Sequence, residues 1–311
     1  MPDDNMTISS EVSDFVQIDG NVSLKISNYS ESSKSEQSCS ISGENRIPVI
    51  VSNRGYKQPP RNRKPCENIT IKRSNKLLTA VQLPVVVNLN PRSIYNKAEE
   101  FKTMMEQLDV GVCFMSESWD RQSLGLSEII GMDGYRVIKN VQQRSGKGGK
   151  PALIISEKDY YIKELCPDEF SVPPNVEAVW AMLTPKAGGT KGHLKHIAVC
   201  SYYYTVKTKR SEFVDHVSEV YNLLCAKYGP GLHFILAGDT NRLNLKSILN
   251  LSPNLKQVVS VPTRNNPDAI LDTIITTLPM YYQEPVTLPP LDNDSDNNGK
   301  PSDHLIVYMP P

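Results

Sequence analysis

The chain has 311 residues, of which 39% are hydrophobic and 22% are charged, and its 34 Lys and Arg residues balance its 34 Asp and Glu residues. This is the composition of an ordinary globular protein. No apolar run approaches the roughly 18 residues that a membrane-spanning helix needs, and the acidic start of the chain lacks the basic and then apolar pattern of a signal peptide. We therefore expect neither a membrane protein nor a secreted one.

The first 79 residues differ in composition from the rest. Residues 1–45 are acidic and rich in serine, and from residue 46 the charge reverses to a basic segment around Pro59 and Pro60. Such a segment buries too little apolar surface to offset the entropy of ordering it. We predict that residues 1–79 form a disordered tail, acidic and then basic, and that residues 80–311 form one folded domain. The basic segment could contact nucleic-acid phosphates, although most charge runs are simply solvated.

The folded part has many strands and few helices. Apolar side chains recur at helical spacing over 97–108 and over 211–228, which predicts two amphipathic helices. Strands are predicted at 83–90, 110–116, 135–140, 152–156, 176–183, 195–204, 232–238, 271–277 and 305–309. This order is neither strict βαβ alternation nor all-β, so it disfavours a pure Rossmann sheet and fits two sheets flanked by helices.

Acidic and amide residues recur at the ends of these strands, where loops converge. The residues concerned are Asn90, Glu117, Asp239, Asn241, Asp303 and His304. Taken singly, an Asp or Asn at a strand end is usually a turn residue. Together they supply what metal-assisted phosphoester hydrolysis requires: carboxylates for a hard cation, a general base and donors for phosphate oxygens.

Five motifs follow one another along the folded part: NPRSIYNKAEEF at 90–101, SESW at 116–119, GDTN at 238–241, PTRNNPDAILDTIIT at 262–276 and PSDHLIV at 301–307. In this order they resemble the endonuclease/exonuclease/phosphatase superfamily, and within it the endonuclease domain of non-LTR (LINE-type) retrotransposons. The resemblance covers about residues 80–311. It implies a four-layer α/β sandwich, in which two mixed β-sheets pack face to face and are flanked by helices.

The resemblance implies a metal site. Glu117 would be the principal ligand, with Asn90 beside the metal, and Asp303 would be an accessory metal ligand or an orienting carboxylate. The implied cation is Mg²⁺, with Mn²⁺ as the alternative. Many repair-type relatives have an acidic residue two positions after the first motif Asn, where this chain has Arg92, as is common in the retroelement branch. This departure argues against a second metal site.

The resemblance also implies the residues that handle the water and the phosphate. Asp239 would activate or orient the attacking water, and Asn241 would hold the scissile phosphate. Asp272 would hydrogen-bond His304 and leave its imidazole facing the phosphate.

A tyrosine from the end of the predicted strand 195–204 would donate to a phosphate oxygen. Successive side chains of a strand point to opposite faces, so three neighbouring tyrosines cannot all face the site. We favour Tyr204, and then Tyr203, because the family's usual Tyr-x-Pro would place Val206 at the proline position. Trp119 is interpreted as a packing residue rather than a base-stacking platform.

We therefore expect a divalent-metal-dependent endonuclease that nicks DNA and derives from a retroelement, and that is intracellular, and nuclear if it acts on chromosomal DNA. Because the chain stops after the last strand, we expect target-primed copying to need a reverse transcriptase from another polypeptide. One alternative is a phosphatase or phosphodiesterase of the same superfamily that acts on a small-molecule or lipid phosphate. The other is a catalytically inactive nucleic-acid-binding remnant. The retroelement-like motifs argue against the first, and the filled catalytic positions argue against the second.

Overall fold

The computed structural model describes residues 83–119, 125–139, 149–165, 169–186, 194–205, 207–265, 268–291 and 302–311. It also describes two short strands, β1 (Arg46–Ile47) and β2 (Ile71–Lys72), which pair antiparallel. The remainder of residues 1–82 lies outside the described residues. The prediction of a disordered tail falls on that segment, so it stays a prediction.

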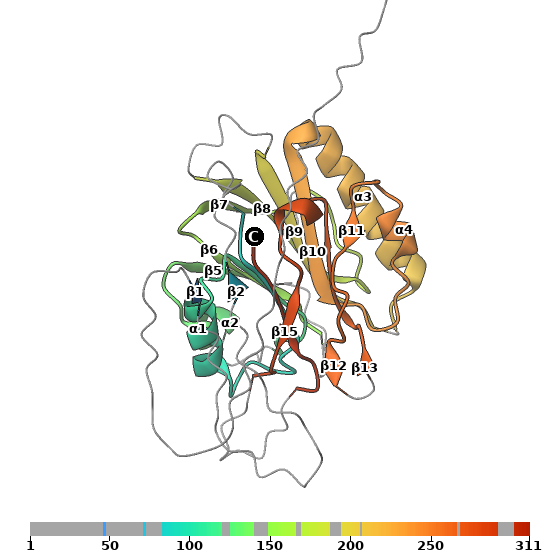
Figure 1. The fold of residues 1–311 in the computed structure, drawn as a ribbon. Helices are drawn as coiled ribbons and strands as arrows, with labels where there is room; N and C mark the ends of the chain where they lie inside the picture. Colours follow the sequence, from blue (N-terminus) through green and yellow to red (C-terminus); the bar gives the residue numbers. More distant parts are fainter. Residues whose placement is uncertain are drawn as a thin grey trace, which may run out of the picture.

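Two six-stranded mixed sheets form the centre of the domain (Figure 1). The first has the order β11-β14-β10-β9-β8-β7 and is built from β7 (Tyr160–Glu164), β8 (Glu177–Pro185), β9 (His196–Tyr203), β10 (Leu232–Asp239), β11 (Lys256–Gln257) and β14 (Asp272–Thr276). The second has the order β15-β16-β3-β4-β6-β5 and is built from β3 (Val86–Leu89), β4 (Val112–Met115), β5 (Tyr135–Lys139), β6 (Ala152–Ser156), β15 (Val286–Leu288) and β16 (Ile306–Met309). A separate hairpin joins β12 (Arg264–Asn265) to β13 (Asp268–Ala269).

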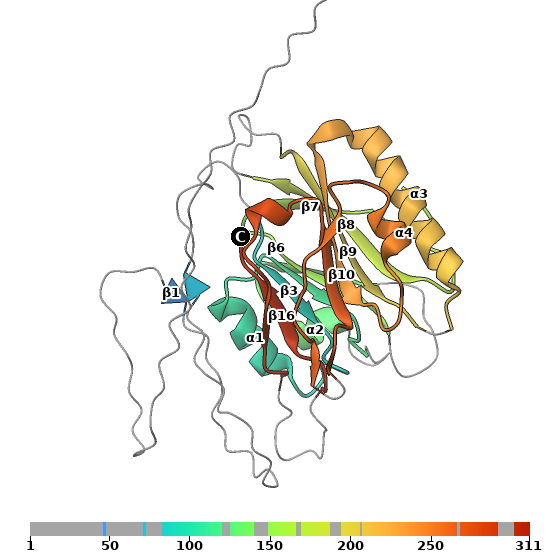
Figure 2. The same cartoon turned by 45° about the vertical axis from the view of Figure 1, so that its right-hand side comes forward.

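Helices cover the outer face of each sheet (Figure 2). α1 (Ala98–Gln107) and α2 (Leu126–Ile130) pack on the second sheet, and α3 (Arg210–Tyr228) and α4 (Lys246–Leu249) pack on the first. Short 3-10 turns lie at Gly229–Gly231 and Pro279–Tyr281. Each sheet contains one parallel pair, β3 with β4 and β9 with β10, and a helix crosses over between the two strands of each pair. The predicted four-layer α/β sandwich is confirmed.

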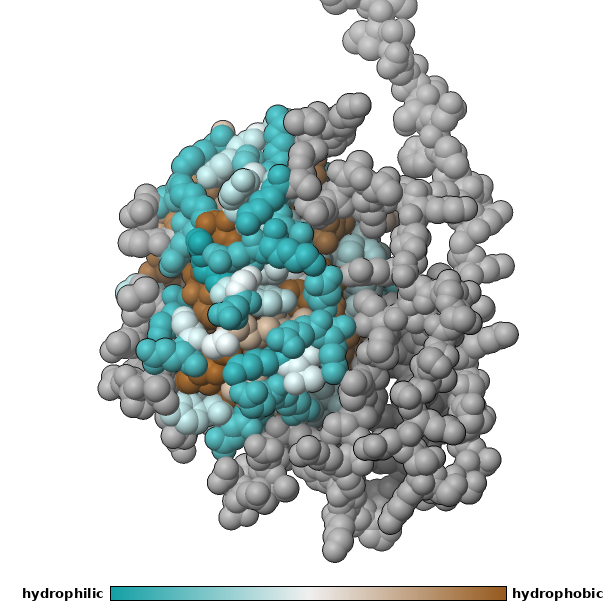
Figure 3. All heavy atoms as spheres, turned by 90° about the vertical axis from the view of Figure 1, so that its left-hand side faces the viewer, coloured by the Kyte–Doolittle hydropathy of each residue, from teal (hydrophilic) through white to brown (hydrophobic). Residues whose placement is uncertain are grey.

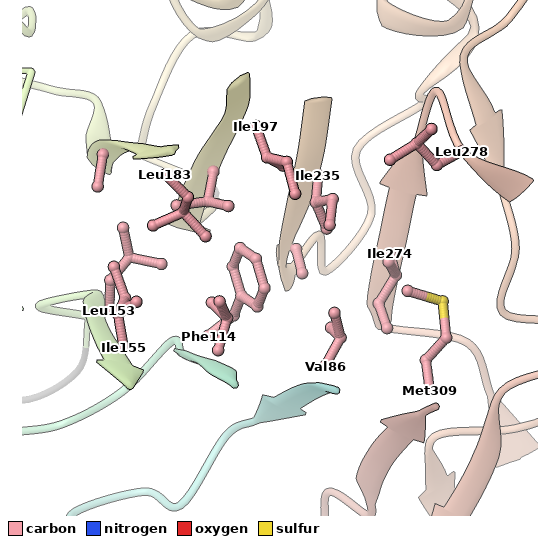
Figure 4. Close-up of a cluster of buried hydrophobic side chains, with 14 of the residues drawn as sticks. Val86, Phe114, Leu153, Ile155, Leu183, Ile197, Ile235, Ile274, Leu278 and Met309 are labelled. Atoms are coloured by element: carbon pink, nitrogen blue, oxygen red, sulfur yellow. The ribbon is translucent and has the colours of Figure 1, made fainter. Parts of the chain in front are cut away.

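One apolar core fills the space between the two sheets (Figure 4). The period-2 alternation of β4 shows how the layers are made, because Val112 and Phe114 face this inner core while Cys113 and Met115 face the helices α1 and α2. Strands buried on both faces read as continuous apolar runs, which is why they were recognisable in the sequence. The edge strand β7 escaped prediction because only its first residue, Tyr160, is buried.

The surface shown in Figure 3 is mixed, with hydrophilic residues around separate apolar patches. Among the described residues, no helix has the length and apolar character to span a membrane. This agrees with the sequence, which contains no long apolar run.

Candidate active site

The predicted site residues come from strands of both sheets that meet at one end of the sandwich. Asn90 directly follows β3, Glu117 lies two residues after β4, and Asp239 is the last residue of β10. Asp272 is the first residue of β14 and stands opposite Asp239 in the antiparallel ladder, while His304 lies just before β16. Because β14 and β16 run against their neighbours, their beginnings meet the ends of β10 and β3.

The inner faces of the strands change from apolar to polar toward this end. Along β9, Ile197 and Val199 belong to the core between the sheets, whereas Ser201 donates from its Oγ to the Met115 carbonyl of the opposite sheet, at 3.1 Å. The next inward position is Tyr203. Because alternate side chains of a strand point to the same face, the site residues continue the layer of side chains that lies between the two sheets.

Asn90 links the two sheets. Its fully buried amide Nδ2 lies 3.2 Å from Oε1 of Glu117 and 3.0 Å from Oδ2 of Asp239, and its Oδ1 accepts the backbone N–H of Arg92. In this arrangement Asn90 holds two carboxylates together as a donor. Its role beside a metal stays a prediction.

Glu117 is a buried carboxylate that accepts hydrogen bonds from neutral groups. Besides Asn90, the indole Nε1 of Trp119 donates to its Oε2 at 2.8 Å, and the hydroxyl of Tyr203 donates to it as well. Burial first, and then the negative charge of Glu117, raise the pKa of Tyr203. Among the described residues no basic side chain is paired with Glu117, and the partners seen there are neutral dipoles.

Asp239 is the most perturbed carboxylate of the site. Its Oδ1 accepts the backbone N–H of Asn241 at 2.8 Å, and its own backbone N–H donates to Oγ of Ser116. Burial, followed by the repulsion of Asp272, raises its pKa to about 7, although the nearby His304 lowers it. A carboxyl group with such a pKa exchanges a proton near neutral pH.

His304 and Asp272 form a buried pair. Nδ1 of His304 lies 2.7 Å from Oδ2 of Asp272, and Nε2 lies 3.9 Å from Oδ2 of Asp239. Burial by itself lowers the pKa of His304, but the hydrogen bond to Asp272 and the charges of Asp272, Asp239 and Asp303 together raise it above its ordinary value. Oδ1 of Asp272 is buried without a hydrogen-bond partner among the described residues.

This end of the sandwich offers two places for a cation. One lies at Glu117 and Asp239; the other lies at Asp239, Asp272 and His304, whose ligand atoms are all within 4.8 Å of one another. The first is the better fit, because the described partners of Glu117 are neutral donors, whereas the second already contains His304, whose raised pKa favours its positively charged form. Buried carboxylates that lack a positive partner are suitable ligands for a hard divalent cation.

The structure reverses our order for the tyrosines. Tyr204 packs its ring against Phe213 of α3 at 5.8 Å between centroids, and Tyr202 lies on the same face with its hydroxyl on Thr273. Only Tyr203 points between the sheets and reaches Glu117. The strand alternation thus favours Tyr203 over Tyr204 for the predicted role, and the role of a tyrosine at the phosphate stays a prediction.

Asn241 lies at the rim of the site in a left-handed conformation with φ of 48°. Its side-chain Nδ2 donates to the backbone carbonyl of Tyr204 at 2.7 Å, and its backbone N–H is fixed by Asp239. The loop after β10 is thus tied to the end of β9. The predicted role of Asn241 in holding the phosphate stays a prediction.

Both carboxylate oxygens of Asp303 form ion pairs with arginine side chains. Its Oδ1 lies 2.9 Å from Arg92, and its Oδ2 accepts Nε of Arg264 at 2.7 Å and a second guanidinium nitrogen at 2.6 Å. Nε2 of His304 lies 3.9 Å from Oδ1. Of the two predicted roles, these ion pairs favour the orienting carboxylate over the accessory metal ligand.

Sequence reasoning missed four buried or half-buried residues that hold the site together. Asn88 donates across the sheets to the carbonyls of Gly238 and Thr273, and Ser302 donates to the carbonyl of Asn90 at 2.7 Å. Ser116 accepts from Asp239, and Trp119, interpreted as packing, donates to Glu117. The signal for Asn88 was present, because a polar residue on the inner face of a buried strand requires a partner.

Backbone strain gathers around the site. Six described non-glycine residues have positive φ, and five of them lie in the loops at this end: Arg92, Ser93, Trp119, Lys150 and Asn241. Left-handed conformations cost about 1–2 kcal/mol for such residues, and they persist where the surrounding contacts enforce them. For Arg92, Trp119 and Asn241 these contacts are hydrogen bonds to Asn90, Glu117 and Asp239.

No protein-family model matches the chain, and no curated protein matches it in sequence. Solved structures do. An AP endonuclease from Leishmania major is similar with a TM-score of 0.53 and 12% identity, covering 73% of this chain and 86% of that one. A mannosyl-6-phosphatase from Bacteroides thetaiotaomicron is similar with a TM-score of 0.51 and 16% identity, covering 73% and 98%.

The endonuclease domain of TRAS1, a telomere-specific non-LTR retrotransposon, is similar with 17% identity over 73% of this chain and 96% of that one, at a TM-score of 0.49. At identities this low, the similarity to the structures with TM-scores above 0.5 shows the fold alone and says nothing of the reaction. The chain therefore has the fold of the endonuclease/exonuclease/phosphatase family proteins, as its sequence motifs predict.

Proposed function

We propose that the chain is a divalent-metal-dependent endonuclease that hydrolyses phosphodiester bonds in DNA and derives from a retroelement. The observation that carries the proposal is the convergence of Asn90, Glu117, Asp239, Asp272 and His304, which lie far apart in the sequence and touch one another in a chain of contacts. A hydrolase of phosphate esters needs this combination of carboxylates and an imidazole.

In this proposal the residues act through protons and charge. Asp239, with a pKa of about 7, accepts the proton of the attacking water, and its position is fixed by Asn90 and Asn241. His304, with its raised pKa, is held by Asp272 and presents Nε2 to a phosphate oxygen. Tyr203, whose hydroxyl reaches Glu117, donates to a phosphate oxygen when substrate is bound.

Glu117, with Asn90 beside it, would hold Mg²⁺ or Mn²⁺. A cation bound there supplies Lewis-acid polarisation of the scissile phosphate. The orphaned carboxylate oxygen of Asp272 and the raised pKa of Asp239 both indicate that this end of the sandwich carries more negative charge than its own side chains compensate. DNA is the preferred substrate because the motifs at 90–101 and 262–276 resemble retroelement endonucleases rather than phosphatases.

Plasmid nicking tests the proposal. Supercoiled plasmid is incubated with the protein in Mg²⁺ and in EDTA, and we expect nicks only with the metal. Glu117→Gln and His304→Ala are each expected to lower the rate on the order of 10²-fold or more. Raising Mg²⁺ should partly restore Glu117→Gln, which loses only ligand charge, but not His304→Ala.

Glu157→Gln is the matched control, since this carboxylate pairs with Arg136 on the surface, next to β6 and away from the site. It should nick at the wild-type rate. Wild-type protein that releases phosphate from a phosphomonoester but leaves plasmid intact would instead favour the phosphatase alternative. Inactivity on both, with every divalent metal, would favour the inactive remnant.

A further inference from the structure

Two guanidinium groups share a single carboxylate beside the site. Arg92 and Arg264 pair with opposite oxygens of Asp303, at 2.9 Å and 2.6 Å. The side chain of Arg92 is 44% exposed and that of Arg264 is 31% exposed, so both reach solvent. Two positive charges against one negative charge leave this cluster with a net charge of about +1.

Both arginines are fixed to site residues through the backbone. The N–H of Arg92 donates to Oδ1 of Asn90 at 3.2 Å. Arg264 forms an antiparallel bridge with His304, and the neighbouring N–H of Leu305 donates to the carbonyl of Thr263 at 2.7 Å. The guanidinium groups are thereby held close to Nε2 of His304, which lies 3.9 Å from the shared carboxylate. Figure 1 shows the β12–β13 hairpin that begins with Arg264 at the lower end of the domain.

The backbone at Arg92 is strained, with φ of 48° there and 93° at Ser93. A non-glycine residue pays to adopt this conformation, so the turn is maintained by its contacts to Asn90 and Asp303. Within those contacts Arg264 uses no more than two of its five N–H donors on Asp303, and Arg92 forms an ion pair with Oδ1 at 2.9 Å without a hydrogen bond to it. The remaining donors are available to an anion.

We propose that Arg92 and Arg264, positioned by Asp303, form a clamp that binds a backbone phosphate of the DNA next to the scissile one. This rests on the proposed endonuclease function and adds the residues that hold the flanking strand. A guanidinium presents paired N–H donors that match phosphate oxygens, and a carboxylate between two guanidiniums orients them without cancelling their charge. In this role Asp303 acts on the arginines and is not a metal ligand.

A surface ion pair elsewhere in the protein provides the contrast. Arg136 pairs with Glu157 at 2.7 Å with a similar exposure of 49%, but one to one, so that pair is neutral. Arg136 of β5 pairs with Ile155 of β6, and Ile155 pairs with Val112 at the beginning of β4. It therefore lies toward the opposite end of the sheet from Glu117 and serves as a matched control.

The experiment measures nicking kinetics and the salt dependence of binding to a labelled DNA duplex in EDTA. Arg92→Gln and Arg264→Gln should each raise KM about 10-fold, as expected for loss of a charge-assisted hydrogen bond, with kcat changed less than about 3-fold. Each should also reduce the slope of log K against log salt by about 1, because one phosphate contact is lost. Arg264→Lys should keep the salt slope and recover part of the KM, since the charge remains without the fork. Arg136→Gln should change neither quantity.

The outcomes separate the two proposals. If wild-type protein nicks plasmid but Arg92→Gln and Arg264→Gln keep the wild-type KM and salt slope, the clamp is refuted and the endonuclease stands. If these variants lose kcat and also unfold at lower temperature, while Arg264→Lys restores both, the ion pairs are structural and the clamp is refuted as well. If wild-type protein neither nicks nor binds DNA, both proposals fall.

Discussion

The raised pKa of Asp239 makes the stability of the metal-free protein depend on pH. Burial and the neighbouring Asp272 raise this pKa from 3.8 to about 7. Because the folded carboxyl binds its proton more tightly than the unfolded one, folding is favoured at low pH, and this contribution is lost as pH rises from about 4 through 7. The raised pKa of His304 acts with the same sign, so its contribution is lost above its ordinary value of 6.5.

The magnitude follows from proton linkage. Between pH 5 and pH 7 the folded protein holds up to one proton more than the unfolded chain at this carboxyl, and integrating the difference gives a loss of about 2 kcal/mol. For a domain of this size, 2 kcal/mol corresponds to a decrease in Tm of about 4–8 °C. The Asp239 residue is 1% exposed, so solvent screens the effect little.

The assay is thermal unfolding in EDTA at pH 5, 6 and 7, with Asp239→Asn as the control. Other carboxyl groups titrate in both proteins, so the difference between the two curves reports Asp239 together with its charge coupling to His304. We expect wild type to lose about 2 kcal/mol relative to Asp239→Asn over this range. Saturating Mg²⁺ should reduce the loss in wild type, because a cation binds the ionised form. A difference that stays flat, or that grows in favour of wild type as pH rises, would refute the description of Asp239 as a buried carboxyl with a raised pKa.

Three further changes test the geometry. Tyr203→Phe should lower plasmid nicking about 10-fold or more, because one donor to the transition state is lost, whereas Tyr204→Phe, whose ring faces α3, should nick at the wild-type rate; equal effects would contradict the assignment. Gly238→Ala should destabilise the fold by about 3 kcal/mol in urea unfolding, because its β-carbon would overlap a backbone carbonyl on β9. Gly125→Ala is the control, since its methyl group has room and should change the free energy of unfolding by less than about 1 kcal/mol. Deleting residues 1–79 should leave the Tm of the remaining domain unchanged and alter only DNA affinity, since that segment is too polar to contribute a core; a cooperative loss of structure would show that the tail belongs to the fold.

Much of the architecture could be predicted from local pattern. The strands β4 and β6 are buried on both faces, so each leaves a continuous apolar run ending in a polar residue, and β3 and β10 do so apart from Asn88 and His233. The helices α1 and α3 follow from apolar spacing. The edge strands β7 and β15 could not be found in this way, because most of their residues are exposed or only partly buried and their pattern is weak.

The site, like the fold, could be predicted only in part from the sequence. The residue types and the order of the motifs identify Asn90, Glu117, Asp239, Asp272 and His304, because these stand where strands end and loops begin. No local sequence pattern shows which of these residues contact one another. Their contacts depend on the register of β10 against β14 and of β16 against β3, and on how the two sheets face each other.

Tertiary structure alone decided the finer points. Tyr203 rather than Tyr204 faces Glu117 because β9 presents its odd-numbered residues to the inter-sheet layer, and that choice depends on which face of β9 meets the other sheet. Asp303 is paired with Arg92 and Arg264, which are separated from it by 211 and 39 residues. Ion pairs between residues so distant in sequence form only when packing brings their strands together. A one-dimensional pattern records what each strand must bury, but the partner that satisfies each polar group is set by the arrangement of the sheets in space.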